Sequence, residues 1–229
     1  MSQLALPLQL ADHAVFASFL SDGNEVLVAT LSNLAAGRES HGCWIWGSVA
    51  TGKTHLLQAV CEAAEDRAIY IPLSQFTAVG PGILEDLANC KLICIDDIDL
   101  IAGQAQWEVA LFDLYNQIFS AGGQLLVTAN TTPRECTVEL ADLRSRFLKL
   151  PVFQVQALDE NSRVSALQLR SHHRGIDLPA DTAQYLLKRS RRDMASLYGI
   201  LDLLDKEALR AKRRLTIPFV RDVLSTMSD

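Results

Sequence analysis

The chain has few basic residues in its first half and no long, uncharged apolar run. Its 229 residues carry a net charge of −6. A membrane-spanning helix needs about 18 or more consecutive apolar residues, so none is expected. The acidic balance argues against a dedicated binder of duplex DNA, which usually presents a strongly basic face. The first residues also lack the basic region of a secretory signal or transit peptide, so we expect a cytoplasmic protein.

Cysteine and histidine are sparse and scattered. Neither residue type shows the close pairwise spacing of a zinc site, and no CxxC pair indicates a redox centre. We therefore expect buried thiols and no histidine-based metal site. The five cysteines are Cys43, Cys61, Cys90, Cys94 and Cys136.

The charges are distributed unevenly along the chain. Residues 1–133 carry 4 basic and 14 acidic side chains, a net charge of −10, whereas residues 134–229 carry 17 basic and 13 acidic side chains, a net charge of +4. A basic surface in the C-terminal part would suit DNA or an acidic partner, although most such patches are simply solvated.

Short apolar runs alternate with helix-compatible segments up to about residue 155. A helix is predicted within 12–36, and further helices are predicted at 55–66 and 107–123. Continuous apolar runs are typical of parallel strands that are buried on both faces. The pattern predicts an α/β fold with a parallel five-stranded sheet flanked by helices. The predicted strands are 43–46, 68–72, 91–96, 124–130 and, with the weakest signal, 152–155.

Beyond Pro151 the sequence favours helices. Gly175 suits a helix end, and Pro179 and Pro218 suit the first turns of helices. We therefore expect a nucleotide-binding domain over residues 11–155 and a smaller all-helical subdomain over 156–229. The predicted helices of this subdomain are 159–174, 178–190, 191–213 and 217–227.

The sequence GSVATGKT at 47–54 matches the phosphate-binding loop pattern GxxxxGK[ST] at every defined position. It leaves a predicted strand and enters a predicted helix, which is the context that phosphate binding requires. Lys53 is expected to reach the β and γ phosphates, and Thr54 is expected to offer a hydroxyl to Mg²⁺. The predicted nucleotide-binding residues are Gly47, Ser48, Val49, Ala50, Thr51, Gly52, Lys53, Thr54 and His55.

Two further strand ends carry polar groups. The apolar run LICIDD at 92–97 ends in Asp96 and Asp97. We expect Asp96 to be the magnesium partner and Asp97 to polarise a water molecule, because the carboxyl ends of parallel strands meet beside the phosphates. Asn130 ends another apolar run, where its amide could contact the γ-phosphate. That signal alone is weak, since Asn also ends strands as a turn residue.

Arginines that could contact a nucleotide lie in two segments of the chain. Arg144 and Arg146 lie in LRSRF at 143–147, shortly before the helical subdomain. Arg192 opens a predicted helix within that subdomain, where it either turns back to the phosphates or belongs to a basic stretch. Surface arginines are common, so the residues alone leave the function of all three open.

In combination, these motifs resemble an AAA+ ATPase of the DnaA type. The order of parts is a phosphate-binding loop, a double-Asp strand end, a polar residue on the next strand, an arginine segment and a helical lid. The chain is most similar to the Hda family of DnaA-related regulatory inactivators. The more specific matches are FDLYNQI at 112–118, LQLRSHHRGIDLP at 167–179 and LTIPFV at 215–220.

The first ten residues form, by this resemblance, a flexible tail that docks in the hydrophobic pocket of the DNA polymerase III sliding clamp. A few leucines would be buried in a groove, and the proline would lower the entropy lost on ordering. Such a short segment gives modest affinity, which a ring-shaped partner could raise through avidity. The clamp-binding residues would be Gln3, Leu4, Leu6, Pro7 and Leu8.

The resemblance also implies a function. Such proteins inactivate the initiator DnaA by promoting hydrolysis of its bound ATP on clamp-loaded DNA, which prevents re-initiation of replication. Arg146 would be the arginine finger supplied in trans, with Arg144 as the fallback. The chain's own ligand would be ADP or ATP, contacted by Arg192, and its own ATPase activity would be weak. Because the chain ends at Asp229, we do not expect it to carry the DNA-reading domain of an initiator.

Some Hda-type loops carry Arg where this loop has Lys53, so the chain's own ATP hydrolysis is undecided, as is homo-oligomerisation. An independent P-loop kinase would also need GSVATGKT, but it would usually add an arginine-rich lid between strands. A third interpretation is a helicase-loader-like AAA+ ATPase, which would be expected to bind single-stranded DNA.

Overall fold

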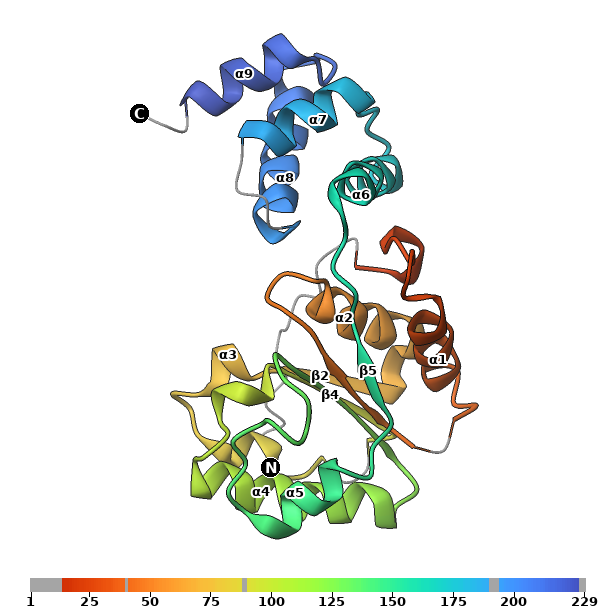
Figure 1. Ribbon diagram of the computed structural model, residues 1–229, viewed down its shortest axis with the longest axis vertical. Coiled ribbons are helices and arrows are strands. Elements are labelled where there is room, and N and C mark those ends of the chain that lie inside the picture. The colour runs from red at the N-terminus through yellow and green to blue at the C-terminus, as the bar shows by residue number, and fades with distance from the viewer. Residues whose placement is uncertain (1–13, 40, 88–89, 190–193, 227–229) are drawn as a thin grey trace. The chain divides into compact units, whose positions relative to one another are not determined.

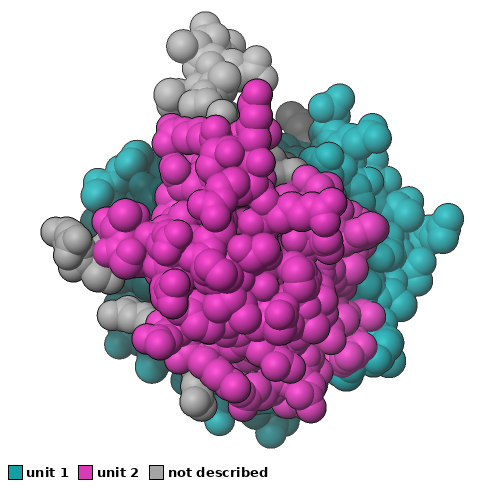
Figure 2. Space-filling model, turned by 90° about the horizontal axis from the view of Figure 1, so that it is seen from above, with its two compact units in different colours: residues 1–16, 23–49, 53–156 teal, residues 17–22, 50–52, 157–229 magenta. Residues whose placement is uncertain are grey.

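The computed structural model describes residues 14–39, 41–87, 90–189 and 194–226 (Figure 1). The chain divides into two compact units, coloured separately in Figure 2. The first unit comprises residues 1–16, 23–49 and 53–156, and the second comprises residues 17–22, 50–52 and 157–229.

A five-stranded parallel sheet forms the centre of the first unit, in the order β2-β3-β4-β1-β5. β3 and β4 are buried along their whole length, as their continuous apolar runs predict, whereas β5 lies at the edge and is partly exposed. The predicted fold class is confirmed. The strands are β1 Cys43–Trp46, β2 Ala68–Pro72, β3 Leu92–Asp96, β4 Gln124–Ala129 and β5 Val152–Gln154.

Helices cover both faces of this sheet (Figure 1). One face carries α1 (Glu25–Ala35) and α2 (Lys53–Ala64). The opposite face carries α3 (Leu73–Phe76), α4 (Ala105–Ser120) and α5 (Ala141–Phe147). Short 3₁₀ turns lie at Phe16–Ser18, Glu65–Arg67, Pro81–Leu84 and Ile98–Leu100.

The core beneath α4 and α5 fixes the position of both helices. Trp107, Leu111, Leu114 and Ile118 recur at helical spacing and bury one face of α4 against the sheet. On α5, Phe147 is buried and packs on Trp44 of β1, with ring centroids 5.2 Å apart. The arginine segment is therefore attached to the sheet by its apolar residues.

The second unit is built mainly from four helices around its own apolar core. Asp159 caps the first of them by accepting a hydrogen bond from the Ser162 amide at 2.7 Å, and Gly175, with φ of +71°, follows its end. Its core includes Leu167, Leu186 and Phe219. The helices are α6 Glu160–His173, α7 Ala180–Arg189, α8 Met194–Ala211 and α9 Ile217–Thr226. Among the described residues, no helix has the length and apolar character needed to cross a membrane.

Candidate functional site

The glycine-rich loop leaves β1 and enters α2, as the sequence predicts. Its first residue, Gly47, is anchored to the sheet because its amide donates to the Ala129 carbonyl of β4 at 3.3 Å. Two residues near the tip adopt left-handed backbone conformations, Ala50 with φ of 62° and Gly52 with φ of 100°. A Cβ on Gly52 would lie 2.8 Å from the Phe19 ring, so this position needs glycine for space as well as for conformation.

Lys53 lies at the start of α2 and is only 5% exposed. Its ammonium donates hydrogen bonds to the carbonyls of Gly47 at 2.7 Å and Ser48 at 3.0 Å, and to the Asn130 side-chain oxygen at 3.2 Å. The structure therefore brings together two of the predicted site residues, Lys53 and Asn130. Burial lowers the pKa of the Lys53 ammonium, while the carboxylates of Asp97, Asp96 and Asp99 oppose that shift.

Asp96 ends β3 and is 2% exposed. One carboxylate oxygen accepts a hydrogen bond from the Tyr70 hydroxyl at 2.8 Å, and the other accepts from the Thr128 hydroxyl. Thr128 in turn accepts a hydrogen bond from the Asp97 amide at 2.9 Å. Burial and, next, the neighbouring Asp96 raise the pKa of the Tyr70 hydroxyl, which therefore stays a donor.

Asp97 follows the strand in a left-handed conformation with φ of 60°. Burial and, next, the Asp96 charge raise the pKa of its carboxyl group, and the Lys53 ammonium opposes the shift. Asp99 lies two residues further on and accepts a hydrogen bond from the Asn130 amide at 2.6 Å. The charges of Asp96, Asp97 and Asp99 thus all act on the loop lysine, and Asp99 holds the backbone of Asn130.

Three of these side chains were not expected from the sequence: Tyr70, Thr128 and Asp99. Thr128 gave a weak signal as a polar residue inside an apolar run, and Asp99 as a third acid after the double Asp. Tyr70 gave none, because an aromatic residue is ordinary in a strand.

The predicted magnesium site has the hard oxygen donors that Mg²⁺ prefers, a hydroxyl on the exposed Thr54 and the carboxylate of Asp96. Both oxygens of Asp96 already accept hydrogen bonds from hydroxyl groups, however. Within the described part of the chain, no group of three or more His, Cys, Asp or Glu side chains is arranged to hold a metal ion. Mg²⁺ would have to reach this carboxylate in competition with Tyr70 and Thr128.

The two predicted arginines lie on α5. Arg144 is exposed, and its guanidinium donates to the Arg134 carbonyl at 3.4 Å. Arg146 is half-buried, with its guanidinium 5.9 Å from the centre of the Tyr115 ring. Neither arginine forms a salt bridge to any residue that the structure describes.

The remaining predicted residues have other surroundings. The His55 ring nitrogen Nε2 lies 3.0 Å from the Val15 carbonyl oxygen, and Val49 is 81% exposed. Arg192 lies outside the described residues, as do the tail residues Gln3, Leu4, Leu6, Pro7 and Leu8.

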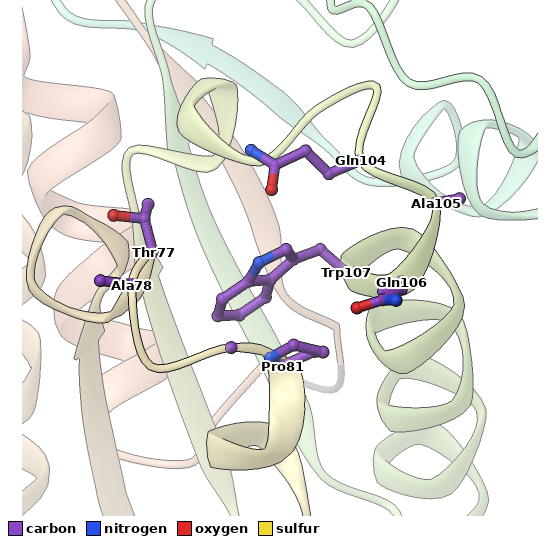
Figure 3. A pocket seen from close by; sticks show the side chains of 8 residues that line it. Thr77, Ala78, Pro81, Gln104, Ala105, Gln106 and Trp107 are labelled. Carbon is purple, nitrogen blue, oxygen red and sulfur yellow. The ribbon is translucent and has the colours of Figure 1, made fainter.

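A pocket of about 370 Å³ lies elsewhere on the first unit, between the turn Pro81–Leu84 and the start of α4 (Figure 3). The Trp107 ring lies between Gln104 and Pro81 in this view. No charged or otherwise titratable side chain is among the lining residues, so the pocket walls offer no acid or base. The lining residues are Thr77, Ala78, Gly80, Pro81, Gln104, Ala105, Gln106 and Trp107.

Comparisons with known proteins place these features in a family context. Residues 159–224 match the model for the Hda lid domain, and residues 81–150 match the model for the bacterial DnaA ATPase domain. Domain III of the replication initiation protein DnaA from Thermotoga maritima is similar in structure. It has a TM-score of 0.77 and 21% identity, over 95% of this chain and 98% of that one.

Two other solved structures share the fold at lower similarity. A replication initiator DnaA bound to AMPPCP and single-stranded DNA gives a TM-score of 0.71 at 20% identity, over 89% of this chain and 69% of that one. A RuvB variant from Thermotoga maritima gives 0.65 at 14% identity, over 91% and 69%. At these identities the structures support the fold alone, and the two family models, which match separate parts of the chain, mark it as an Hda- and DnaA-like AAA+ protein.

Proposed function

We propose that this protein inactivates the replication initiator DnaA by promoting hydrolysis of the ATP that DnaA holds, in complex with the DNA-loaded sliding clamp. The observation that carries the proposal is the arginine segment. α5 presents an exposed arginine and a half-buried one, neither of them neutralised by a carboxylate of the described residues. It occurs in a chain whose lid matches the Hda model.

An arginine supplied by one protein can stabilise the charge that develops when another protein hydrolyses ATP. Such fingers raise the rate by about 10³-fold to 10⁵-fold. Arg146 is the candidate finger, and Arg144 is the fallback. The Tyr115 ring beneath Arg146 limits the directions that its guanidinium can take, which lowers the entropy lost on docking.

The chain's own nucleotide, ADP or ATP, is proposed to bind at the loop 47–54 as a structural ligand, with Arg192 contacting its phosphates. The ammonium of Lys53 is held beside this loop by three hydrogen bonds. Asp97 and Asn130 are the groups that would orient a water molecule. Thr54 and Asp96 would hold Mg²⁺, which would supply Lewis-acid chemistry. Hydrogen bonds from Tyr70 and Thr128 to Asp96 disfavour Mg²⁺ binding, so we expect the chain's own turnover to be slow.

The proposed partners are DnaA, the sliding clamp and, through the clamp complex, DNA. The tail residues Gln3, Leu4, Leu6, Pro7 and Leu8 would dock on the clamp. Homo-oligomerisation would let two copies act on one clamp ring, where avidity would raise the modest affinity of a single tail.

The experiment that tests this proposal follows labelled ATP prebound to DnaA, with the clamp loaded on DNA. The intact protein should accelerate conversion to ADP. Arg146→Ala should lose about 10³-fold of that acceleration, and deletion of residues 2–8 should abolish it at protein concentrations where the intact chain saturates. Arg210→Ala removes an exposed arginine of α8 and serves as the matched control.

Each result has a definite meaning. If Arg144→Ala, and not Arg146→Ala, removes the activity, the fallback arginine is the finger. If the intact protein leaves the rate unchanged, the proposed function is wrong, and direct nucleotide turnover by the chain itself becomes the next measurement. A control variant that loses activity as completely as Arg146→Ala would show general charge loss instead of a finger.

A further inference from the structure

Glu108 is a buried carboxylate that lies outside the phosphate-binding region. It belongs to the first turn of α4 and is 1% exposed. One of its oxygens accepts from the amides of Gly103 at 2.7 Å and Glu139 at 3.0 Å. The other accepts from the amides of Glu139 at 3.1 Å and Leu140 at 2.7 Å. Three backbone N–H groups from two separate segments therefore converge on one side chain.

A charge buried this deeply is costly unless it is well hydrogen-bonded. Glu108 forms no salt bridge within the described part of the chain, so the backbone amides and the positive end of α4 supply the compensation. An apolar side chain at this position would leave the amides of Gly103, Glu139 and Leu140 without an acceptor, so the carboxylate supports stability. It also fixes the geometry of the two segments, because one side chain binds the backbone of both.

The segment that Glu108 holds leads directly into the arginine helix. Leu140 immediately precedes α5, and its carbonyl accepts the Arg144 amide at 3.0 Å. On the same helix as Glu108, two turns further on, Tyr115 contacts the Arg146 guanidinium. α4 thus touches α5 both before its first residue, through Glu108, and near its end, through Tyr115.

We propose that Glu108 is a positioning residue for the arginine helix, fixing where α5 begins and hence where its finger points. This inference rests on the proposed function. It extends the proposed function by naming a residue that positions the arginine finger and touches neither the nucleotide nor the partner. A misplacement of about 1 Å in a group that acts on a transition state can lower the rate by about 10²-fold.

Glu108→Gln tests the proposal, because it keeps the shape of the side chain but sets an NH₂ group against backbone N–H donors. Glu62→Gln, at an exposed position on α2, removes the same charge and is the matched control. In the DnaA-ATP assay, Glu108→Gln should lower the maximal stimulated rate about 10-fold to 100-fold and leave the half-saturating concentration unchanged. The control should behave as the intact protein.

A double variant distinguishes positioning from a general defect. When the finger arginine identified in the hydrolysis assay is already replaced by alanine, adding Glu108→Gln should lower the residual rate far less than it does in the intact protein. A full, independent loss in that background would overturn the proposal. So would a raised half-saturating concentration with an unchanged maximal rate, since that would indicate binding instead of finger geometry.

Amide hydrogen exchange gives a readout that does not depend on the proposed function. Residues 139–147 should exchange faster in Glu108→Gln than in the intact protein, while the sheet strands keep their protection. Unchanged exchange there would overturn the positioning role even if the stimulated rate fell. If the intact protein fails to stimulate hydrolysis, the proposed function fails separately. Should Glu108→Gln not fold, Glu108→Asp, which keeps the charge but shortens the reach by one methylene, replaces it in both assays.

Discussion

Replacing Tyr70 with phenylalanine should lower the unfolding temperature of the ligand-free protein and increase the additional stabilisation by Mg²⁺. The Tyr70 hydroxyl donates to Asp96 at 2.8 Å, and the acceptor carboxylate is 2% exposed. Tyr70→Phe removes that hydroxyl without changing the packing of the ring. One oxygen of Asp96 then keeps its charge and loses its partner, while Thr128 still donates to the other oxygen.

The magnitude follows from the kind of hydrogen bond that is lost. A hydrogen bond to a buried charged group contributes about 1.5 to 3 kcal/mol to the free energy of unfolding. For a chain of 150 to 250 residues, each kcal/mol corresponds to about 2 to 4 °C in the unfolding temperature. In the absence of ligand, Tyr70→Phe should therefore lower the unfolding temperature by about 3 to 12 °C.

The freed oxygen should make Asp96 a better partner for Mg²⁺. A ligand that binds only the folded state raises the unfolding temperature, so binding can be read from the same transition. The assay compares unfolding with ATP alone and with ATP plus Mg²⁺. We expect the additional stabilisation by Mg²⁺ to be larger in Tyr70→Phe than in the unaltered protein, and we expect the chain's own ATP turnover to rise.

Tyr185→Phe, which removes a hydroxyl from α7 of the second unit, is the control and should change neither quantity. The reasoning is refuted if Tyr70→Phe leaves the unfolding temperature unchanged without ligand, because the hydrogen bond would then contribute nothing. It is refuted equally if Mg²⁺ stabilises the variant less than the unaltered protein, because the tyrosine would then support the metal instead of competing with it.

Four further substitutions test three other features. Lys53→Ala should abolish the rise in unfolding temperature on adding ADP; a full rise in the variant would contradict its phosphate role. Burial and Asp96 raise the pKa of the Asp97 carboxyl group from its ordinary value of 3.8. The free energy of unfolding therefore falls as pH rises from that value through the pKa of Asp97 in the folded state, where the carboxyl group ionises. Asp97→Asn should therefore unfold at a higher temperature at pH 7, with the difference vanishing below about pH 3.8; a less stable variant at pH 7 would contradict this. Gly42→Ala would place a Cβ 1.5 Å from the Leu125 carbonyl oxygen and should cost more than about 4 kcal/mol, whereas Gly199→Ala, with open space around it, should add about 0.5 to 1 kcal/mol. Denaturant unfolding of both glycine variants checks that contrast.

The positions of the strands could be predicted from the sequence because their signal is local. Parallel strands covered on both faces are continuous apolar runs, and the runs at 43–46 and 68–72 match β1 and β2 at both ends. The predicted ends of β3, β4 and β5 differ from the observed ones by a single residue. The helix α3 was not predicted, because its four residues are too few to show a helical period.

The phosphate-binding loop and the double Asp were also visible in the sequence, because their chemistry requires fixed spacings next to a strand end. The side chains that surround Asp96 were not visible. Tyr70 pairs in register with Cys94, two residues before Asp96, so Tyr70 and Asp96 lie on the same face of neighbouring strands. Ile95 pairs with Val127, and Thr128 therefore follows beside Asp96. Register between distant segments decides these contacts, and no local pattern encodes it.

Glu108 shows the same limit on prediction. In the sequence it is one acidic residue in the first turn of a helix, a place where acids are common and usually exposed. Only the packing of α4 against the sheet and α5 buries it beneath the amides of Gly103, Glu139 and Leu140. The chemistry at the strand ends could be predicted from the sequence, because it depends on residues that are neighbours in the chain. The contacts between side chains from distant segments could not, because burial and long-range register arise only on folding.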